Sequence, residues 1–189
     1  LLTDKRLRRI YRALSRWTNW WMRHRDSDRD GLPEYHHGND SGWDNATVFD
    51  GGFPVAAPDL AGYLVVQMDL LADLAGRLER KAQANRWKKR SDQLLARMLD
   101  GLWNGNQFVS RRAFSGELFP DGDSLLNYLA VVLGRRMPKA FREKVAAALK
   151  PDGRFVTAWG PATESPDSPL YVPDGYWRGP IWGSETVLV

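Results

Sequence analysis

The chain has 189 residues and a mass of 21.5 kDa, enough for one domain or at most two small ones. Hydrophobic residues make up 43% and charged residues 26%, and there is no long uncharged apolar run, which excludes a disordered chain and predicts no membrane-spanning helix. The net charge is +4. Cysteine is absent, which excludes disulfides and thiolate metal sites. Residues 1–6 show no signal-peptide pattern, so we expect a cytoplasmic protein.

About five helices are predicted, so we expect an all-α fold. Thr3 is a suitable N-cap for the first helix, and Asp59, which follows Pro58, is one for the second. The second helix has apolar residues at spacings of three and four over a wide surface, as expected for a helix buried on more than one side. The predicted helices cover residues 3–23, 59–78, 84–102, 124–136 and 138–150, and another begins near 184.

The helix at 84–102 is strongly basic on one side. Residues 77–99 carry eight basic and two acidic side chains, a local charge of +6, whereas residues 25–58 carry two basic and seven acidic ones, a local charge of −5. Trp87 is the only aromatic residue among these basic charges, so we interpret them as a solvated face and expect no nucleic-acid or membrane partner. The Asn-Gly-Asn run at 104–106 predicts one short β-hairpin.

Two long segments, residues 25–58 and 151–182, are poor in predicted regular structure. Loops longer than about 12–15 residues are uncommon unless they are functional or disordered. Both segments are rich in Trp, Tyr, Phe and Gly, which is not typical of disorder. We therefore predict that both are active-site loops.

The first loop begins with acidic residues at alternate positions. Together with one glycine they match the spacing of ligands in a calcium-binding loop, although the last, bidentate Glu of an EF-hand is missing. Either the loop holds a structural Ca²⁺, or it is an acidic surface turn, or its carboxylates cap the loop and pair with Arg25 and Arg29. The residues of the predicted metal site are Asp26, Asp28, Asp30, the carbonyl of Leu32, and Glu34.

Further along the first loop, Trp43 and Asp44 put an indole directly beside a carboxyl group. A carboxyl group pressed on an aromatic ring in a closed site loses hydration, which raises its pKa toward that of a general acid. The alternative is that Asp40 and Asp44 only cap turns, as aspartate does in most loops.

The second loop ends in a cluster of aromatic residues around one guanidinium group, formed by Tyr176, Trp177, Arg178 and Trp182. Stacking faces beside a forked donor suit a sugar, which has apolar ring faces and hydroxyl edges. The competing interpretation is a cation–π pair that braces the loop.

The two loops also carry a family resemblance. DGLPEYHHGNDSGWDNA and GYWRGPIW resemble glycoside hydrolase family 63, particularly bacterial members that hydrolyse mannosylglycerate, glucosylglycerate and related α-glycosides. The chain is more distantly similar to the trehalases, which share the SGWD motif. The resemblance covers essentially the whole chain, with both motifs in the expected order.

The resemblance implies a six-fold α/α barrel and an inverting mechanism that uses two carboxyl groups. It aligns Asp44 with the general acid. Some members of the family bind calcium near the acidic loop, so a structural Ca²⁺ is the one cofactor considered, and none is required for the chemistry. The residues expected to bind substrate are Trp43, Tyr35, His37, Trp177, Arg178 and Trp182.

The resemblance places the general base on a Glu that follows the second motif further along the chain. Glu185 is the only carboxylate after that motif here and lies too early, so we expect the base to be missing from this chain. A six-fold barrel needs about twice as many helices as are predicted. Residues 1–189 are therefore interpreted as a single partial catalytic domain, about half a barrel, whose partners are a small carbohydrate and either the other half of the barrel or another copy of the chain.

The predicted function is that of an inverting α-glycosidase acting on a small α-glucoside or α-mannoside, with this segment inactive alone. The alternative is a catalytically inert sugar-binding or structural helical module. A Glu-bearing half-barrel encoded after Val189 would favour the enzyme, and a stop codon there would favour the inert module.

Overall fold

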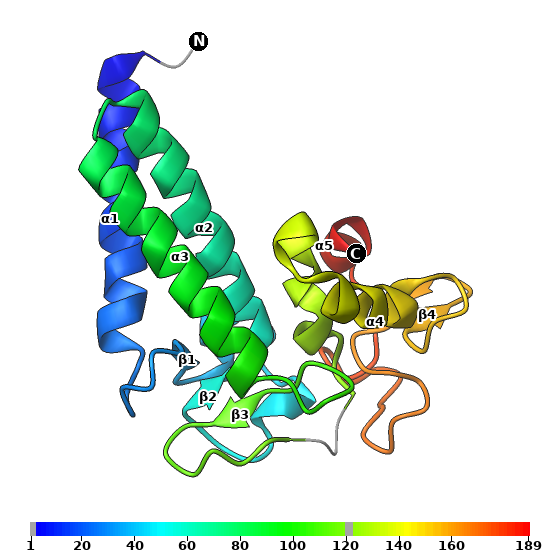
Figure 1. The fold of residues 1–189 in the computed structure, drawn as a ribbon. Coiled ribbons are helices and arrows are strands. Elements are labelled where there is room, and N and C mark those ends of the chain that lie inside the picture. Colours follow the sequence, from blue (N-terminus) through cyan, green and yellow to red (C-terminus); the bar gives the residue numbers. More distant parts are fainter. Residues whose placement is uncertain (1–2, 120–122) are drawn as a thin grey trace.

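The computed structural model describes residues 3–119 and 123–189, and its helices form two groups (Figure 1). The helical fold class is confirmed, and the helix bounds differ from the predicted ones by three residues or fewer. The long helices are α1 (Asp4–His24), α2 (Pro58–Arg77) and α3 (Lys81–Gly101), and the second group comprises η3 (Leu125–Arg136), α4 (Lys139–Leu149) and α5 (Gly183–Leu188).

Helix α1 begins at the predicted cap. The Thr3 hydroxyl accepts a hydrogen bond from the Arg6 backbone N–H at 3.4 Å, which satisfies one donor of the first turn. The buried residues of this helix lie three, four or seven positions apart, so they form one stripe toward α2. These residues are Leu7, Tyr11, Thr18 and Trp21.

Helix α2 is the central helix of the described chain, since it packs against α1, α3 and η3. This agrees with its predicted burial on several sides. The prediction that Asp59 is its N-cap is wrong. The helix begins at Pro58 with Ala57 as N-cap, so Asp59 lies inside the first turn and is 1% exposed.

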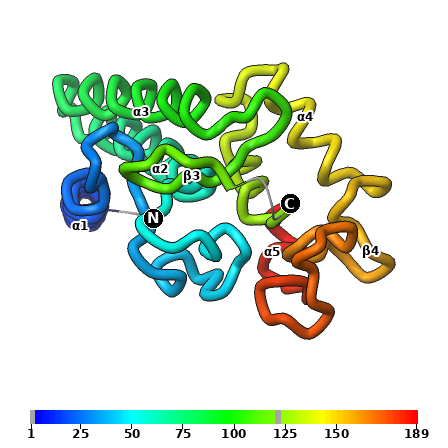
Figure 2. The backbone as a smooth tube through the Cα atoms, turned by 90° about the horizontal axis from the view of Figure 1, so that it is seen from below, coloured from blue at the N-terminus to red at the C-terminus, as the bar shows by residue number. Residues whose placement is uncertain are grey.

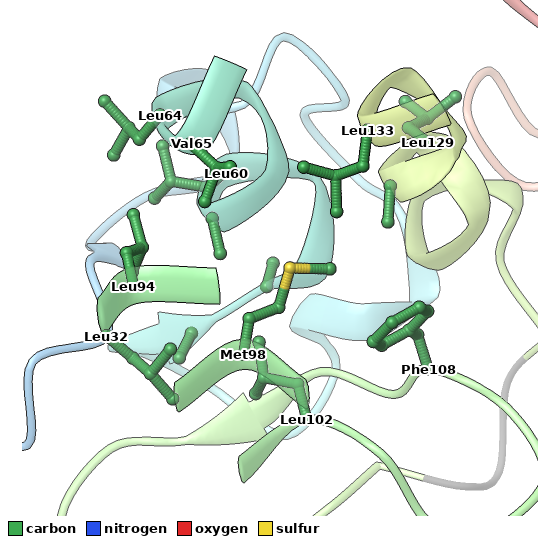
Figure 3. Close-up of a cluster of buried hydrophobic side chains, with 14 of the residues drawn as sticks. Leu32, Leu60, Leu64, Val65, Leu94, Met98, Leu102, Phe108, Leu129 and Leu133 are labelled. Atoms are coloured by element: carbon green, nitrogen blue, oxygen red, sulfur yellow. The ribbon is translucent and has the colours of Figure 1, made fainter. Parts of the chain in front are cut away.

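The core fills the space between α2, α3 and η3 (Figure 3). Met98 of α3 lies at its centre and is fully buried. Leucines from all three helices surround it, and together they remove a continuous apolar surface from water. The labelled residues of this cluster include Leu60, Leu64, Leu94, Leu102, Leu129 and Leu133.

The fourth predicted helix, η3, is a 3₁₀ helix instead of an α-helix. Ser124 caps it by accepting a hydrogen bond from the Leu126 N–H at 3.3 Å, and Gly134 interrupts it with φ of 48° and ψ of −122°. Residues 124–130 are buried without interruption. A run with no exposed positions has no hydrophobic period, so the sequence could not distinguish three residues per turn from 3.6.

Short strands that the sequence did not predict lie in the long loops and in the segment between α3 and η3. Strands β1 (Glu34–Tyr35), β2 (Val55–Ala56) and β3 (Arg111–Arg112) form an antiparallel sheet in that order, which pairs Glu34 with Ala56 and Val55 with Arg112. Strands β4 (Val156–Thr157) and β5 (Gly160–Pro161) form a second antiparallel pair. Two-residue strands are too short to show alternation, which is why they were missed.

The predicted hairpin at 104–106 is present. Trp103 and Phe108 form an isolated antiparallel bridge, and the Asn104 side chain accepts hydrogen bonds from the N–H groups of Asn106 and Gln107. Both long loops lie on the same side of the molecule (Figure 2). Within residues 3–119 and 123–189, no helix combines the length and hydropathy needed to cross a membrane.

Candidate active site

Asn45 joins the two long loops. Its side-chain Nδ2 donates to the Gly175 carbonyl at 3.0 Å, and its Oδ1 accepts from the Trp177 N–H at 3.0 Å. Its backbone carbonyl accepts from Nε of Arg178 at 2.8 Å. The two motifs that the sequence assigned to one site are thus in direct contact. Asn45 was not among the predicted site residues, although it ends the SGWDN motif.

Arg178 reinforces this junction with a two-pronged ion pair. Its Nη1 donates to Oδ2 of Asp50 at 2.9 Å, and its Nη2 donates to Oδ1 of the same carboxylate. The bracing role considered for Arg178 is therefore supported, through an ion pair instead of a cation–π contact. The carboxylate of Asp50 therefore links the first loop to the second.

Three indoles form a continuous stack across the junction. Trp43 and Trp177 lie 4.6 Å apart between ring centroids with planes 27° apart, and Trp177 and Trp182 lie 4.4 Å apart with planes 15° apart. Trp43 is 4% exposed and Trp177 is 7% exposed, so their faces pack on other protein groups. Trp182, which is half-buried, is the member of the stack best placed to offer a face to a ligand.

Asp44 lies at the edge of this stack. Its side chain is exposed, and its Oδ2 accepts a hydrogen bond from the Tyr176 hydroxyl at 3.2 Å. The predicted burial of its carboxyl group against an indole is not present in the described residues. Gly42, with φ of +78°, makes the turn that precedes it, a conformation that favours glycine.

Asp40 has a capping role. Its Oδ2 accepts hydrogen bonds from the backbone N–H groups of His36 and His37 at 3.0 and 3.2 Å, and its Oδ1 pairs with Arg25 at 3.3 Å. These bonds start the short 3₁₀ helix η1 (Gly38–Asp40). The turn-capping alternative therefore holds for Asp40 and leaves Asp44 as the accessible acid.

His37 and Tyr35 lie in different environments. His37 is exposed, its Nδ1 accepts from the Asn39 N–H at 3.1 Å, and its ring stacks on Phe53 at 6.0 Å. The expectation that Tyr35 contacts substrate is not supported. Its ring is 3% exposed in the core, and its hydroxyl donates to Oδ2 of Asp59 at 2.7 Å.

Asp59 is a buried acid that the sequence analysis took for a helix cap. Burial raises its pKa from 3.8 to about 7, the hydrogen bond from Tyr35 opposes that shift, and the nearby charge of Glu185 adds to it. Burial also raises the pKa of Glu185 and of the Tyr63 hydroxyl. Oδ1 of Asp59 has no hydrogen-bond partner among the described residues. The sequence carries no signal for this group, because it depends on contacts between distant segments.

The acidic loop brings three of its predicted metal ligands together. One oxygen each from Asp26, Asp28 and Glu34 lies within 4.8 Å of the others. Asp30 is a correction, because its carboxylate pairs with Arg111 of β3 and also accepts from the Leu32 N–H at 2.7 Å. The capping part of the alternative is present, because Asp26, Asp28 and Asp30 each accept a hydrogen bond from a backbone N–H of the loop. Its pairing part is not, because Arg25 pairs with Asp40 and no ion pair of the described residues joins Arg29 to these carboxylates.

The three grouped carboxylates suit a hard cation. Burial, followed by the charges of Asp28 and Glu34, raises the pKa of Asp26, against the hydrogen bond from the Gly31 N–H and the charge of Arg97. Oε1 of Glu34 is buried without a hydrogen-bond partner among the described residues. An oxygen-ligand cation such as Ca²⁺ would offset this repulsion and satisfy that oxygen.

A scan against protein families matches residues 3–189 to the family described as mannosylglycerate hydrolase MGH1-like glycoside hydrolase domain. A search of curated proteins gives no match. One similar solved structure is the mannosylglycerate hydrolase of family 63 from Thermus thermophilus in complex with glucose. Its sequence identity to this chain is 21% and its TM-score is 0.72. The match covers 94% of this chain and 53% of that one.

Two further structures show the same fold. An uncharacterised conserved protein from Thermus thermophilus is 19% identical with a TM-score of 0.75, over 94% of this chain and 56% of that one. A structure described as a sialidase is 18% identical with a TM-score of 0.82, over 98% of this chain and 17% of that one. The chain thus spans about half the length of the Thermus proteins, as the prediction of a partial barrel requires.

Proposed function

Because the chain belongs to the mannosylglycerate hydrolase MGH1-like glycoside hydrolase family, we propose that the intact protein is an inverting α-glycosidase. The proposed substrate is a small α-glucoside or α-mannoside of the glucosylglycerate or mannosylglycerate type. A neighbouring structure that is a mannosylglycerate hydrolase holding glucose supports this choice of sugar.

Asp44 is the proposed general acid. The observation that carries this assignment is that Asp44 is exposed beside the tryptophan stack and forms no ion pair among the described residues, whereas Asp40 and Asp50 are each held by an arginine. Tyr176 orients the carboxyl group through its hydrogen bond, and the acid would protonate the leaving oxygen.

The proposed general base is a Glu outside residues 1–189. In an inverting enzyme the two carboxyl groups stand roughly 6.5–9.5 Å apart, so that a water molecule fits between the base and the sugar. The junction made by Asn45 and Arg178 would hold the acid at a fixed distance from groups supplied by the rest of the barrel. The exposed face of Trp182 would support the sugar ring.

The test uses the intact protein and two substrates, the natural type of glycoside and one with an activated leaving group that needs little protonation. Asp44→Asn should lower kcat on the natural type by roughly 10²–10⁴-fold, because the amide keeps the shape but cannot donate the proton, and much less on the activated substrate. Asp50→Asn is the control, since loosening the loop junction should slow both substrates alike.

Equal losses on both substrates for Asp44→Asn would show that another residue is the acid. Sugar binding without any turnover by the unaltered protein would instead support the inert sugar-binding module.

A structural Ca²⁺ in the acidic loop is the other part of this proposal. Asp26, Asp28 and Glu34 would hold it, and its role would be to fix the loop that leads to Asp44, outside the chemistry. The grouped carboxylates and the unsatisfied Oε1 of Glu34 support the site.

A further inference from the structure

A cavity of about 340 Å³ between α1 and the start of α3 is lined by a group of arginines and by no carboxylate. We propose that this arginine pocket binds a small phosphorylated molecule through its phosphate groups. Its arginines are Arg12, Arg16, Arg80, Arg86 and Arg90.

The pocket is built by arginines that face each other from two helices. Arg12 and Arg16 lie one turn apart on α1, and Arg86 and Arg90 lie one turn apart on α3. Residues spaced by four share a helix face, so each pair projects into the same space. Arg80, the residue before α3, is the fifth.

A hydrogen-bonded aromatic floor holds part of this group in place. Nε1 of Trp87 donates to the Tyr11 hydroxyl at 3.0 Å, and that hydroxyl donates to Oε1 of Gln83 at 2.9 Å. The Arg80 guanidinium lies 5.3 Å from the Tyr11 ring centroid, and that of Arg90 lies 4.6 Å from the Trp87 centroid. These cation–π contacts orient two of the charges before a ligand arrives.

The charges of the pocket are not neutralised by the protein. Across residues 3–119 and 123–189, none of the five arginines forms a salt bridge, whereas the nearby Lys88 pairs with both Asp69 and Asp92. Burial and the charge of Arg86 lower the pKa of Arg90, which reflects the cost of holding these cations together. An anion in the pocket would remove that cost.

A buried hydroxyl adds an unsatisfied polar group to the wall. Oγ of Ser15, which lies between Arg12 and Arg16 on α1, is buried and has no hydrogen-bond partner among the described residues. A buried polar atom without a partner destabilises the protein, and a phosphate oxygen that reached it after a small shift of the wall would supply the missing bond.

The size and chemistry favour a small phosphate compound over a polymer. Guanidinium groups bind phosphate through two parallel hydrogen bonds, and a cavity of this volume lies at the lower end of small-molecule pockets. Tyr11 and Trp87 are buried, so they offer no free face for stacking a base. The basic surface of α3 therefore has two parts, the predicted solvated face and the arginines that line the pocket.

The pocket is separate from the candidate active site. Its α1 residues lie between positions 11 and 19, in the middle of that helix. The first of the two site loops follows the C-terminal end of α1 (Figure 1). A ligand there would act on stability or regulation and would not be the sugar substrate.

The experiment measures binding of tripolyphosphate and of glucose 6-phosphate to the full chain by calorimetry, at fixed ionic strength. Arg16→Gln and Arg86→Gln should each weaken binding by roughly tenfold, because each loses a charge-assisted contact. Lys89→Gln is the matched control: it removes an exposed charge of α3 that does not line the pocket, and it should leave the affinity unchanged.

The two probes also distinguish the sources of the phosphate. Preference for glucose 6-phosphate would support a sugar phosphate, and preference for tripolyphosphate would support a nucleotide-like phosphate chain. The proposal is overturned if all three variants bind both probes as the unaltered chain does. It is equally overturned if a single-stranded RNA binds through these arginines while neither small phosphate does.

Discussion

Replacing Asp59 by Asn should make the protein more stable at high pH and should change it little at low pH. The carboxyl group is fully buried, and its pKa is about 7 in the folded protein against an ordinary value of 3.8. The folded state therefore holds the proton more tightly than the unfolded state does. The stability that the protonated form provides is complete below 3.8 and is lost as the pH rises through about 7.

The size of the effect follows from the two pKa values. At about 1.36 kcal/mol per pKa unit, the difference is worth about 4 kcal/mol as an order-of-magnitude figure. Asn cannot ionise, and its amide oxygen keeps the acceptor for the Tyr35 hydroxyl. The Asn variant should therefore exceed the unaltered protein by up to about 4 kcal/mol at about pH 8, and by little at about pH 4.

The assay is urea unfolding of both proteins across this pH range, with Asp167→Asn as the control because Asp167 is an exposed acid. Asp123, whose pKa burial raises to about 6, adds its own pH dependence to all of these proteins, so it cancels in the difference. The reasoning is refuted if the difference between the unaltered protein and Asp59→Asn stays constant from about pH 4 to about pH 8.

Two further predictions concern the loops. Asn45→Ala removes two of the three hydrogen bonds that Asn45 makes across the loop junction, so amide exchange in residues 171–182 should accelerate by roughly tenfold or more. Unchanged exchange would show that the junction does not depend on Asn45. Calcium should raise the melting temperature of the unaltered chain but not that of the Glu34→Gln variant. The Asp30→Asn variant is the control and should keep the calcium response, because Asp30 pairs with Arg111. An equal rise in melting temperature for all three proteins would disprove the site.

The helices and the positions of the two long loops could be predicted from sequence because their signals are local. The apolar spacing in α2 spans several turns, and the Asn-Gly-Asn run specifies a turn by itself. The choice of Asp44 over Asp40 rested mainly on family resemblance and stays a proposal, for which the capping bonds of Asp40 are a separate argument.

What could not be predicted depends on contacts between distant segments. The burial of Tyr35 and its bond to Asp59 join residues 24 positions apart, through a strand too short to leave a pattern. The arginine pocket requires α1 and α3 to face each other, and no property of either helix alone reveals that. The stacked indoles likewise use faces that the sequence assigned to a sugar.

The loop junction has a consequence for the order in which the molecule folds. Asn45 and Arg178 are 133 residues apart, and closing an unstructured segment of that length costs about 4 kcal/mol of chain entropy. Folding α2, α3, η3 and α4 first shortens the free segment and brings the loop ends near each other, so this route has the lower barrier. We therefore expect the candidate active site to be the last part of the chain to assemble, a step in which the three stacked indoles, among the nine tryptophans of the chain, change their surroundings.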